Sequence, residues 1–112
     1  MSFKEITQNV ERMELLEERL GVRLQGLMAT VDDEVVGSEH KLKIAGEIYS
    51  ASGGSLDSDV MVDIVAQNEK GQVVGMLSLF INRDKFVGYE AFSDSIYCKA
   101  FPTRIKIVPR PL

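Results

Sequence analysis

The sequence predicts a mainly β fold: an antiparallel β-sandwich preceded by one N-terminal amphipathic helix, in a single domain over residues 1–112. Three observations lead to this prediction. Several short apolar segments are separated by turn-forming residues, which is typical of a sandwich. Two of these segments flank a short polar stretch that contains Gly71, as in a β-hairpin. By contrast, the apolar residues near the N-terminus recur at helical spacing.

The N-terminal segment is expected to form one helix over residues 3–20. Its apolar residues lie three or four positions apart and so share one helical face: Phe3, Ile6, Val10, Met13, Leu16 and Leu20. Ser2 and Glu5 fit a capping box, and Gly21 is a common helix terminator. We therefore divide the chain into a helical part, residues 1–21, and a sandwich, residues 22–112. The helix packs on the sheet or serves as a dimer contact.

The strands are expected in the remainder of the chain. Residues 22–30 alternate weakly and form a first strand or continue the helix, and residues 41–50 alternate clearly. Further strands are expected at 59–67, 72–82, 96–100 and 104–108, with a polar connection at 82–95. Pro109 and Pro111 are expected to keep the last strand from extending, because proline lacks the N–H that a sheet uses.

The second strand of the hairpin is apolar on both faces. We place Val73, Leu77, Leu79 and Ile81 on one side, and Val74, Met76 and Phe80 on the other. A strand that is apolar on both sides needs two covering layers. The second layer is expected to be the N-terminal helix or a partner subunit.

Composition and charge narrow the functional classes. Thirteen basic and seventeen acidic residues give a net charge of −4, which argues against broad binding to a phosphate backbone. Near the C-terminus, four cations lie close to Tyr97 and Phe101 in the sequence: Lys99, Arg104, Lys106 and Arg110. Such a combination can stack bases. Four cations on an acidic chain are few for that purpose, so we expect no nucleic-acid partner.

The sequence also indicates the cellular compartment. No apolar run approaches the ~18 residues of a membrane span, so no membrane partner is expected. Cys98 is the only cysteine, which favours a reducing compartment. The N-terminal residues lack the basic and then apolar order of a secretion signal, and we expect a cytoplasmic location.

Catalytic and metal-binding patterns are weak. His40 is the only histidine and Cys98 the only cysteine, and nothing in the sequence brings them together as a catalytic dyad. Cys98 is expected to be a buried core thiol. Asp57, Asp59 and Asp63 suggest a calcium loop, but its required glycine and its closing glutamate are missing. We expect no enzyme activity, no metal and no cofactor.

Several segments together suggest a family. They are Ile44-Ala45-Gly46-Glu47-Ile48, the Gly-Ser loop at 52–55, Leu56 to Ala66, Glu69 to Gly75, and Val87-Gly88-Tyr89-Glu90-Ala91-Phe92. Over residues 40–108 this pattern resembles the FxLYD-type immunoglobulin-like β-sandwich domains. Gln67-Asn68 stands where that family has Tyr-Asp. The resemblance implies an immunoglobulin-like sandwich that acts as a binding or structural module, without catalytic residues to carry over.

The leading hypothesis is a non-catalytic interaction or assembly module, which binds a protein partner or forms a homodimer. The expected interaction residues lie on the apolar strand face and the N-terminal helix: Phe3, Ile6, Val10, Met13, Val74, Met76 and Phe80. The alternative is a small-molecule-binding or enzymatic domain with a pocket near residues 83–94, lined by Phe86, Tyr89 and Phe92.

Overall fold

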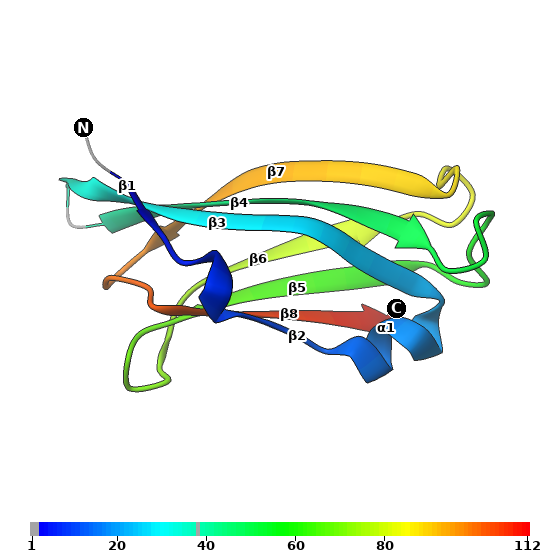
Figure 1. Ribbon diagram of the computed structural model, residues 1–112, viewed down its shortest axis with the longest axis horizontal. Coiled ribbons are helices and arrows are strands. Elements are labelled where there is room, and N and C mark those ends of the chain that lie inside the picture. Colours follow the sequence, from blue (N-terminus) through cyan, green and yellow to red (C-terminus); the bar gives the residue numbers. More distant parts are fainter. Residues whose placement is uncertain (1–2, 38) are drawn as a thin grey trace.

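The computed structural model describes residues 3–37 and 39–112; the side chains of residues 3 and 33–36 are outside the description. The described chain is mainly β, as predicted, and forms two four-stranded sheets that face each other (Figure 1). The first sheet has the order β1-β3-β4-β7 and the second β2-β8-β5-β6. The first contains β1 (Phe3–Glu5), β3 (Val22–Val36), β4 (Glu39–Ser50) and β7 (Tyr89–Cys98). The second contains β2 (Val10–Arg12), β8 (Arg104–Pro111), β5 (Val60–Gln67) and β6 (Val73–Ile81).

The core lies between the two sheets. Alternate residues of each long strand point inward, as Leu42, Ile44 and Ile48 do on β4, and all three are fully buried. From the second sheet, β5 contributes Val60, Val62, Ile64 and Ala66, and β8 contributes Ile105 and Ile107. The strand predicted at 59–67 is therefore confirmed as β5.

The prediction of one helix over residues 3–20 is wrong for most of that range. Only α1 (Glu14–Leu20) is α-helical; before it come β1, a 3-10 turn (Thr7–Asn9) and β2. β1 pairs antiparallel with β3, and β2 pairs parallel with β8, so this segment crosses from one sheet to the other. Threonine, asparagine and valine are weak helix formers, and two short strands around a turn also carry Ile6 and Val10 inward.

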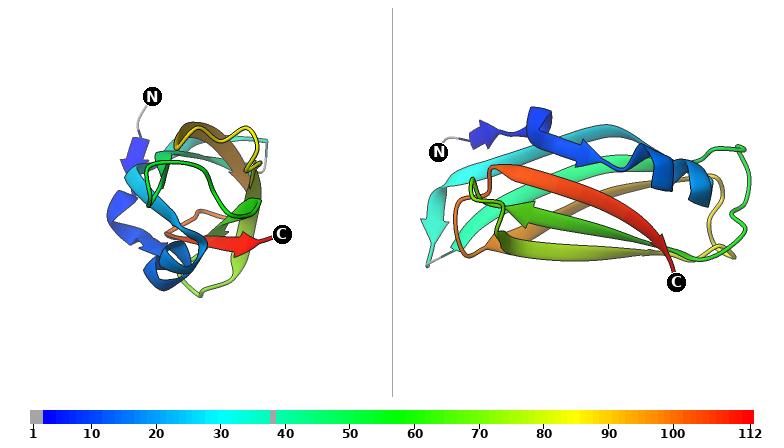
Figure 2. Two further views of the ribbon diagram at one scale, coloured as in Figure 1. Left: turned by 90° about the vertical axis from the view of Figure 1, so that its right-hand side faces the viewer. Right: turned by 90° about the horizontal axis from the view of Figure 1, so that it is seen from below.

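Gly21 ends α1 as predicted. It has a φ of 72°, the left-handed conformation of a helix C-cap, and its N–H bonds back to the carbonyls of Glu17 and Glu18. The chain then turns directly into β3. The helix therefore closes the end of the sandwich beside β8 (Figure 2).

The predicted hairpin is confirmed. β5 and β6 pair antiparallel, with Val60 opposite Ile81 and Val65 opposite Met76. The turn is built by Asn68, whose Oδ1 accepts the backbone N–H groups of Lys70 and Gln72. Gly71 supplies the positive φ, 77°, that the turn requires.

A β-bulge in β6 changes which side chains point outward. Ala66 pairs with Gly75 but the next residue, Gln67, pairs with Val73, so Val74 is the extra residue. Val74 is therefore buried, while Val73 is 60% exposed. The prediction that Val74 shares a face with Met76 and Phe80 is wrong, because simple alternation does not hold across a bulge.

Two other expectations need correction. Residues 89–95, expected in a polar connection, belong to β7, where polar residues such as Ser93 and Asp94 lie on an edge strand. β8 continues through both Pro109 and Pro111, which pair with Val62 and Val60. β2 pairs with β8 only as far as Ile107, so the prolines lie where β8 has one strand neighbour and needs no second set of N–H bonds.

Candidate functional site

The candidate site is the outer face of the second sheet, the side turned away from the core (Figure 2, right). Odd-numbered residues of β5 and even-numbered residues of β8 point to this side, because their neighbours along each strand are buried. Its residues are Glu11 on β2; Arg104, Lys106, Val108 and Arg110 on β8; Met61, Asp63, Val65 and Gln67 on β5; and Val73, Met76, Ser78 and Phe80 on β6. We call this set the outer face.

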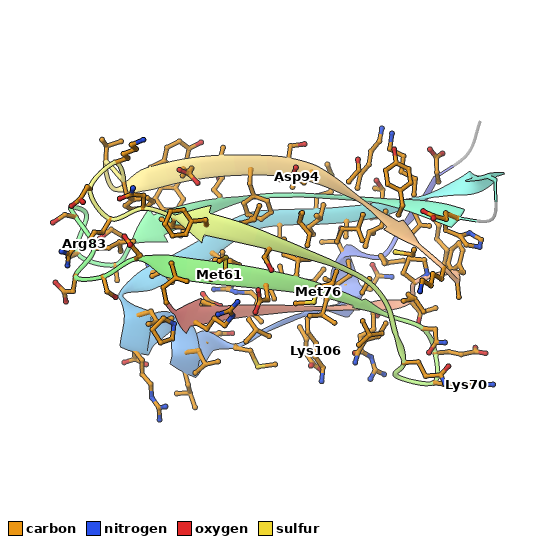
Figure 3. All side chains as sticks on the ribbon, turned by 180° about the vertical axis from the view of Figure 1, so that it is seen from behind. Met61, Lys70, Met76, Arg83, Asp94 and Lys106 are labelled. Atoms are coloured by element: carbon orange, nitrogen blue, oxygen red, sulfur yellow. The ribbon has the colours of Figure 1, made fainter. Side chains whose placement is uncertain are left out.

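Apolar side chains dominate the outer face along β5 and β6. Met76 is 57% exposed and Phe80 is 52% exposed. The register places Phe80 directly opposite Met61 and Met76 directly opposite Val65, so the exposed residues form cross-strand pairs and are not isolated. Figure 3 labels Met61 and Met76 on these two strands. A contiguous apolar surface of this kind is a common feature of protein contact sites.

A polar cluster lies in the middle of these apolar residues. Asp63 is only 9% exposed, and each of its carboxylate oxygens accepts one hydrogen bond. Ser78 Oγ donates to Oδ1 over 2.7 Å, and Arg110 Nε donates to Oδ2 over 2.6 Å. The hydrogen bonds from Ser78 and Arg110 lower the pKa of Asp63. The carboxylate therefore stays ionised and holds the Arg110 side chain across the sheet.

The β8 side of the outer face is basic. Arg104, Lys106 and Arg110 alternate with the buried residues of the strand and all point outward. Lys106 Nζ lies 3.8 Å from Glu11 Oε2, a loose pair in which both side chains are exposed to solvent. The Arg104 side chain is exposed and forms no hydrogen bond or ion pair with any part of the chain that the structure describes. The face thus combines an apolar half with a basic border.

The outer side of the first sheet has a different character. Its β4 and β7 residues include Lys41, Lys43 and Glu47 opposite Tyr97, Ser95 and Ala91. Tyr49 and Tyr89 pack there at a ring-centroid distance of 5.1 Å. Glu47 helps to raise the pKa of both phenols, a smaller cause for Tyr49 than burial but the larger one for Tyr89. This mixed polar surface fits a solvated sheet face.

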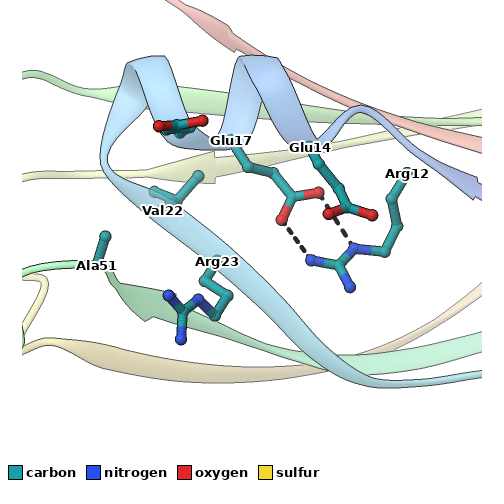
Figure 4. A pocket seen from close by; sticks show the side chains of 7 residues that line it. Arg12, Glu14, Glu17, Val22, Arg23 and Ala51 are labelled. Atoms are coloured by element: carbon teal, nitrogen blue, oxygen red, sulfur yellow. Dashed lines mark hydrogen bonds and ion pairs between the residues drawn. The ribbon is translucent and has the colours of Figure 1, made fainter.

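A hollow of about 290 Å³ lies beside α1 and is lined by charged residues (Figure 4). Two of its charged residues, Arg12 and Glu17, serve the fold. Glu17, 3% exposed, receives Arg12 Nη2 at 2.7 Å and Arg12 Nε at 3.2 Å, a bidentate ion pair. Glu17 Oε1 also accepts the backbone N–H of Leu24, which ties α1 to β3. The hydrogen bond to Glu17 raises the pKa of Arg12. We therefore assign this pair to stability.

The structure separates the predicted interaction residues. Met76 and Phe80 lie on the outer face, but Ile6 and Val74 are buried in the core and cannot meet a partner. Val10 is half-buried against the core. Met13 precedes α1 and lines a hollow of about 390 Å³ with Leu15 and Leu16, away from Met76. Phe3 is in β1, and its side chain is among those not described.

The expected second cover for β6 is not the N-terminal segment. That segment pairs with β3 and β8 and packs at the far edge of the second sheet from β6. It therefore leaves Met76 and Phe80 uncovered within the chain.

The residues expected to form the alternative sites, a pocket near residues 83–94 and a base-stacking surface, also lie apart from one another. Phe86 and Phe92, expected to line a pocket near residues 83–94, are buried in the core, while Tyr89 lies on the outer side of the first sheet. Of the residues considered for base stacking, Arg104 and Lys106 lie on the second sheet and Tyr97 on the first. Phe101 is half-buried beside His40 and below the Lys4 amine. Tyr97 therefore does not share a sheet with Arg104 and Lys106.

Sequence reasoning did not identify the β5 residues of the outer face. Met61 and Val65 flank Asp63 at positions that strict alternation assigns to solvent, and the apolar residues there were the available signal. The Asp63–Ser78–Arg110 cluster joins three strands across 47 residues of chain, and no local pattern points to it.

The remaining reactive groups are accounted for. Cys98 is a fully buried core thiol, as predicted, and desolvation raises its pKa to about 11. Within the described ranges no three acidic, histidine or cysteine side chains gather as they would around a metal ion. The helix that the structure describes is too short to traverse a lipid bilayer. Comparison with family models, with curated proteins and with solved structures finds no match to this chain.

Proposed function

We propose that this domain is a non-catalytic interaction module that binds another protein through the outer face of the second sheet. The observation that carries the proposal is the uncovered apolar surface on β5 and β6, with Met76 and Phe80 more than half exposed. Burying such side chains contributes about 25 cal/mol per Å² of apolar area removed from water. A partner therefore gains binding energy here that the isolated domain does not use.

The polar residues of the face support the same function. Interfaces commonly combine apolar anchors with an arginine at fixed position, surrounded by a polar rim. Arg110 is fixed by Asp63, which is itself fixed by Ser78, so little side-chain entropy is lost when a partner meets the guanidinium. We regard the immunoglobulin-like resemblance as part of this proposal. Two facing, mainly antiparallel sheets support it, while the pairing of β3 with β4 within one sheet differs from the immunoglobulin order, in which the second and third strands lie in opposite sheets.

A random 16-residue peptide library, displayed on phage and selected against the immobilised domain, tests the proposal. Peptides favour the surface that releases most apolar area. We expect the enriched peptides to bind wild type and to lose at least about tenfold in affinity for Phe80→Asp, because the new charge must be desolvated. The matched control is Tyr97→Asp, which changes a similarly exposed aromatic on the other sheet.

Both variants must keep the thermal transition of wild type, which is expected because both side chains are more than half exposed. Enriched peptides that bind Phe80→Asp as tightly as wild type would refute the proposed surface.

A further inference from the structure

The charges of the outer face point to the chemistry of its partner. This inference rests on the proposed function. The apolar residues follow β6 and β5, and the cations follow β8, so the two kinds of side chain form parallel columns. Neighbouring strands lie ~4.8 Å apart, so the columns on β6 and β8 are separated by roughly 10 Å. That separation equals about the width of one α-helix with its side chains.

The cations of β8 are only partly neutralised within the chain. Asp63 engages Arg110 through one of its nitrogens, Nε, and Glu11 lies 3.8 Å from Lys106. Arg104 has no such neighbour in the described chain. A guanidinium carries five N–H donors, so Arg104 and Arg110 both retain donors for an outside acceptor. An approaching segment that is apolar throughout would desolvate these groups without pairing them, at a cost in free energy.

Two copies packed outer face to outer face do not supply the missing carboxylates. Packing two outer faces together brings the same three cations of each β8 to the interface. The carboxylates of that face, Asp63 and Glu11, already interact with Arg110 and Lys106 of their own chain. Charge complementarity therefore favours a different protein with carboxylates of its own.

We infer that the outer face binds an amphipathic helix of another protein, whose apolar side covers Met61, Met76 and Phe80 and whose acidic flank pairs with Arg104 and Lys106. Arg104 and Lys106 lie two residues apart on one strand, roughly 7 Å. Carboxylates one helical turn apart, at i and i+4, are separated by a similar distance of about 6 Å. Acidic residues at that spacing can meet both cations at once.

The experiment uses peptides enriched from the same 16-residue library. We expect them to carry glutamate or aspartate at i and i+4 beside an apolar stripe. Replacing both acids by glutamine should weaken binding to the wild-type domain by about five- to tenfold, the loss expected for two partly exposed ion pairs. Arg104→Gln removes one of the two ion pairs, so it should weaken the parent peptide by about two- to threefold and should not weaken the glutamine peptide further. Arg23→Gln, on the opposite sheet, should change neither value.

Any other result contradicts the inference, the proposed function or both. Peptides that lose affinity for Phe80→Asp but need no acidic residue overturn the acidic helix and leave the proposed function standing. A dimer in light scattering that Phe80→Asp dissociates assigns the face to a second copy and also overturns this inference. Peptides insensitive to Phe80→Asp, or a library without enriched sequences, overturn the inference and the proposed function together. The glutamine peptide is measured on unaltered protein, so misfolding of a variant cannot imitate the expected result.

Discussion

At the scale of single residues, a buried ion pair holds α1 against the sandwich. Glu17 is almost fully buried and depends on Arg12 for its charge compensation. Arg12→Ala leaves that carboxylate uncompensated. We expect a loss of about 3 kcal/mol, the low end for breaking a buried pair, because the Arg12 side chain is 32% exposed. Urea denaturation measures it. An unchanged midpoint for Arg12→Ala, against an Arg23→Ala control, would show that the pair is dispensable.

Asp63 gives the domain a defined sensitivity to acid. Its folded-state pKa lies below the usual 3.8, since Ser78 and Arg110 bond to the ionised form. Its contribution is therefore fully present above pH ~4 and is lost as the pH falls through the lower folded value. Asp63→Asn should lower stability at pH 7 and flatten the dependence of stability on pH below ~4. Stability measured by urea denaturation from pH 2.5 to 7 tests this, and equal slopes in variant and wild type would contradict it.

Cys98 should be chemically silent in the folded domain. Burial raises its pKa to about 11, so little thiolate is present near neutral pH, and the sulfur is inaccessible to reagents. We expect no reaction with a thiol reagent such as DTNB at pH 8 under native conditions. One thiol per chain should be released in urea. Rapid labelling of the native protein would place Cys98 outside the core.

At the scale of the element, β6 depends on the bulge at Val74 and on the small residue after it. A Cβ built at Gly75 would lie 2.7 Å from Ile96 Cγ2 and 3.0 Å from Cys98 Sγ, closer than packed atoms allow. Gly75→Ala should therefore cost about 1–3 kcal/mol through overpacking. Gly54→Ala has open space around its Cβ and serves as the control in the same thermal denaturation. Equal melting temperatures would mean that β7 yields to the added methyl.

The elements also show what could be predicted from the sequence. β4 and the β5–β6 hairpin were predictable, because strict alternation and the Asn68–Gly71 turn agree with each other. The N-terminal segment was not, since Ile6 and Val10 point inward both in a helix and in the observed order of β1, 3-10 turn and β2. Only the last residues of β7, 96–98, were predicted as strand; residues 89–95 were missed because Ser93, Asp94 and Ser95 obscure the period of this edge strand.

Part of the candidate site was predictable for the same reason. The apolar excess of β6 identified Met76 and Phe80 directly. The side of the sheet to which Val74 points was predicted wrongly, because a single bulge reverses the alternation of side chains. The Asp63–Arg110 pair depends on which strands become neighbours, and β5 meets β8 only in the folded chain.

At the scale of the whole molecule, the two sheets have distinct roles. Their inner faces form one core, the outer side of the first sheet mixes charged residues with Met28 and tyrosines, and that of the second is apolar with a basic border. The apolar outer residues add little to folding because water still covers them. We accordingly expect the Met76→Ser/Phe80→Ser double variant to change stability by about 1 kcal/mol or less. Calorimetry measures this, and a large loss would mean that these side chains belong to the core.

Methionine methyl NMR during titration with an enriched 16-residue peptide tests the interaction surface most directly. Met61 and Met76 lie on the outer face, whereas Met13 precedes α1 and Met28 is on β3 of the first sheet. We predict large shifts for the Met61 and Met76 methyl groups and none for Met13 and Met28. Shifts centred on Met13 or Met28, with Met61 and Met76 unmoved, would contradict the assignment of the binding surface to the second sheet.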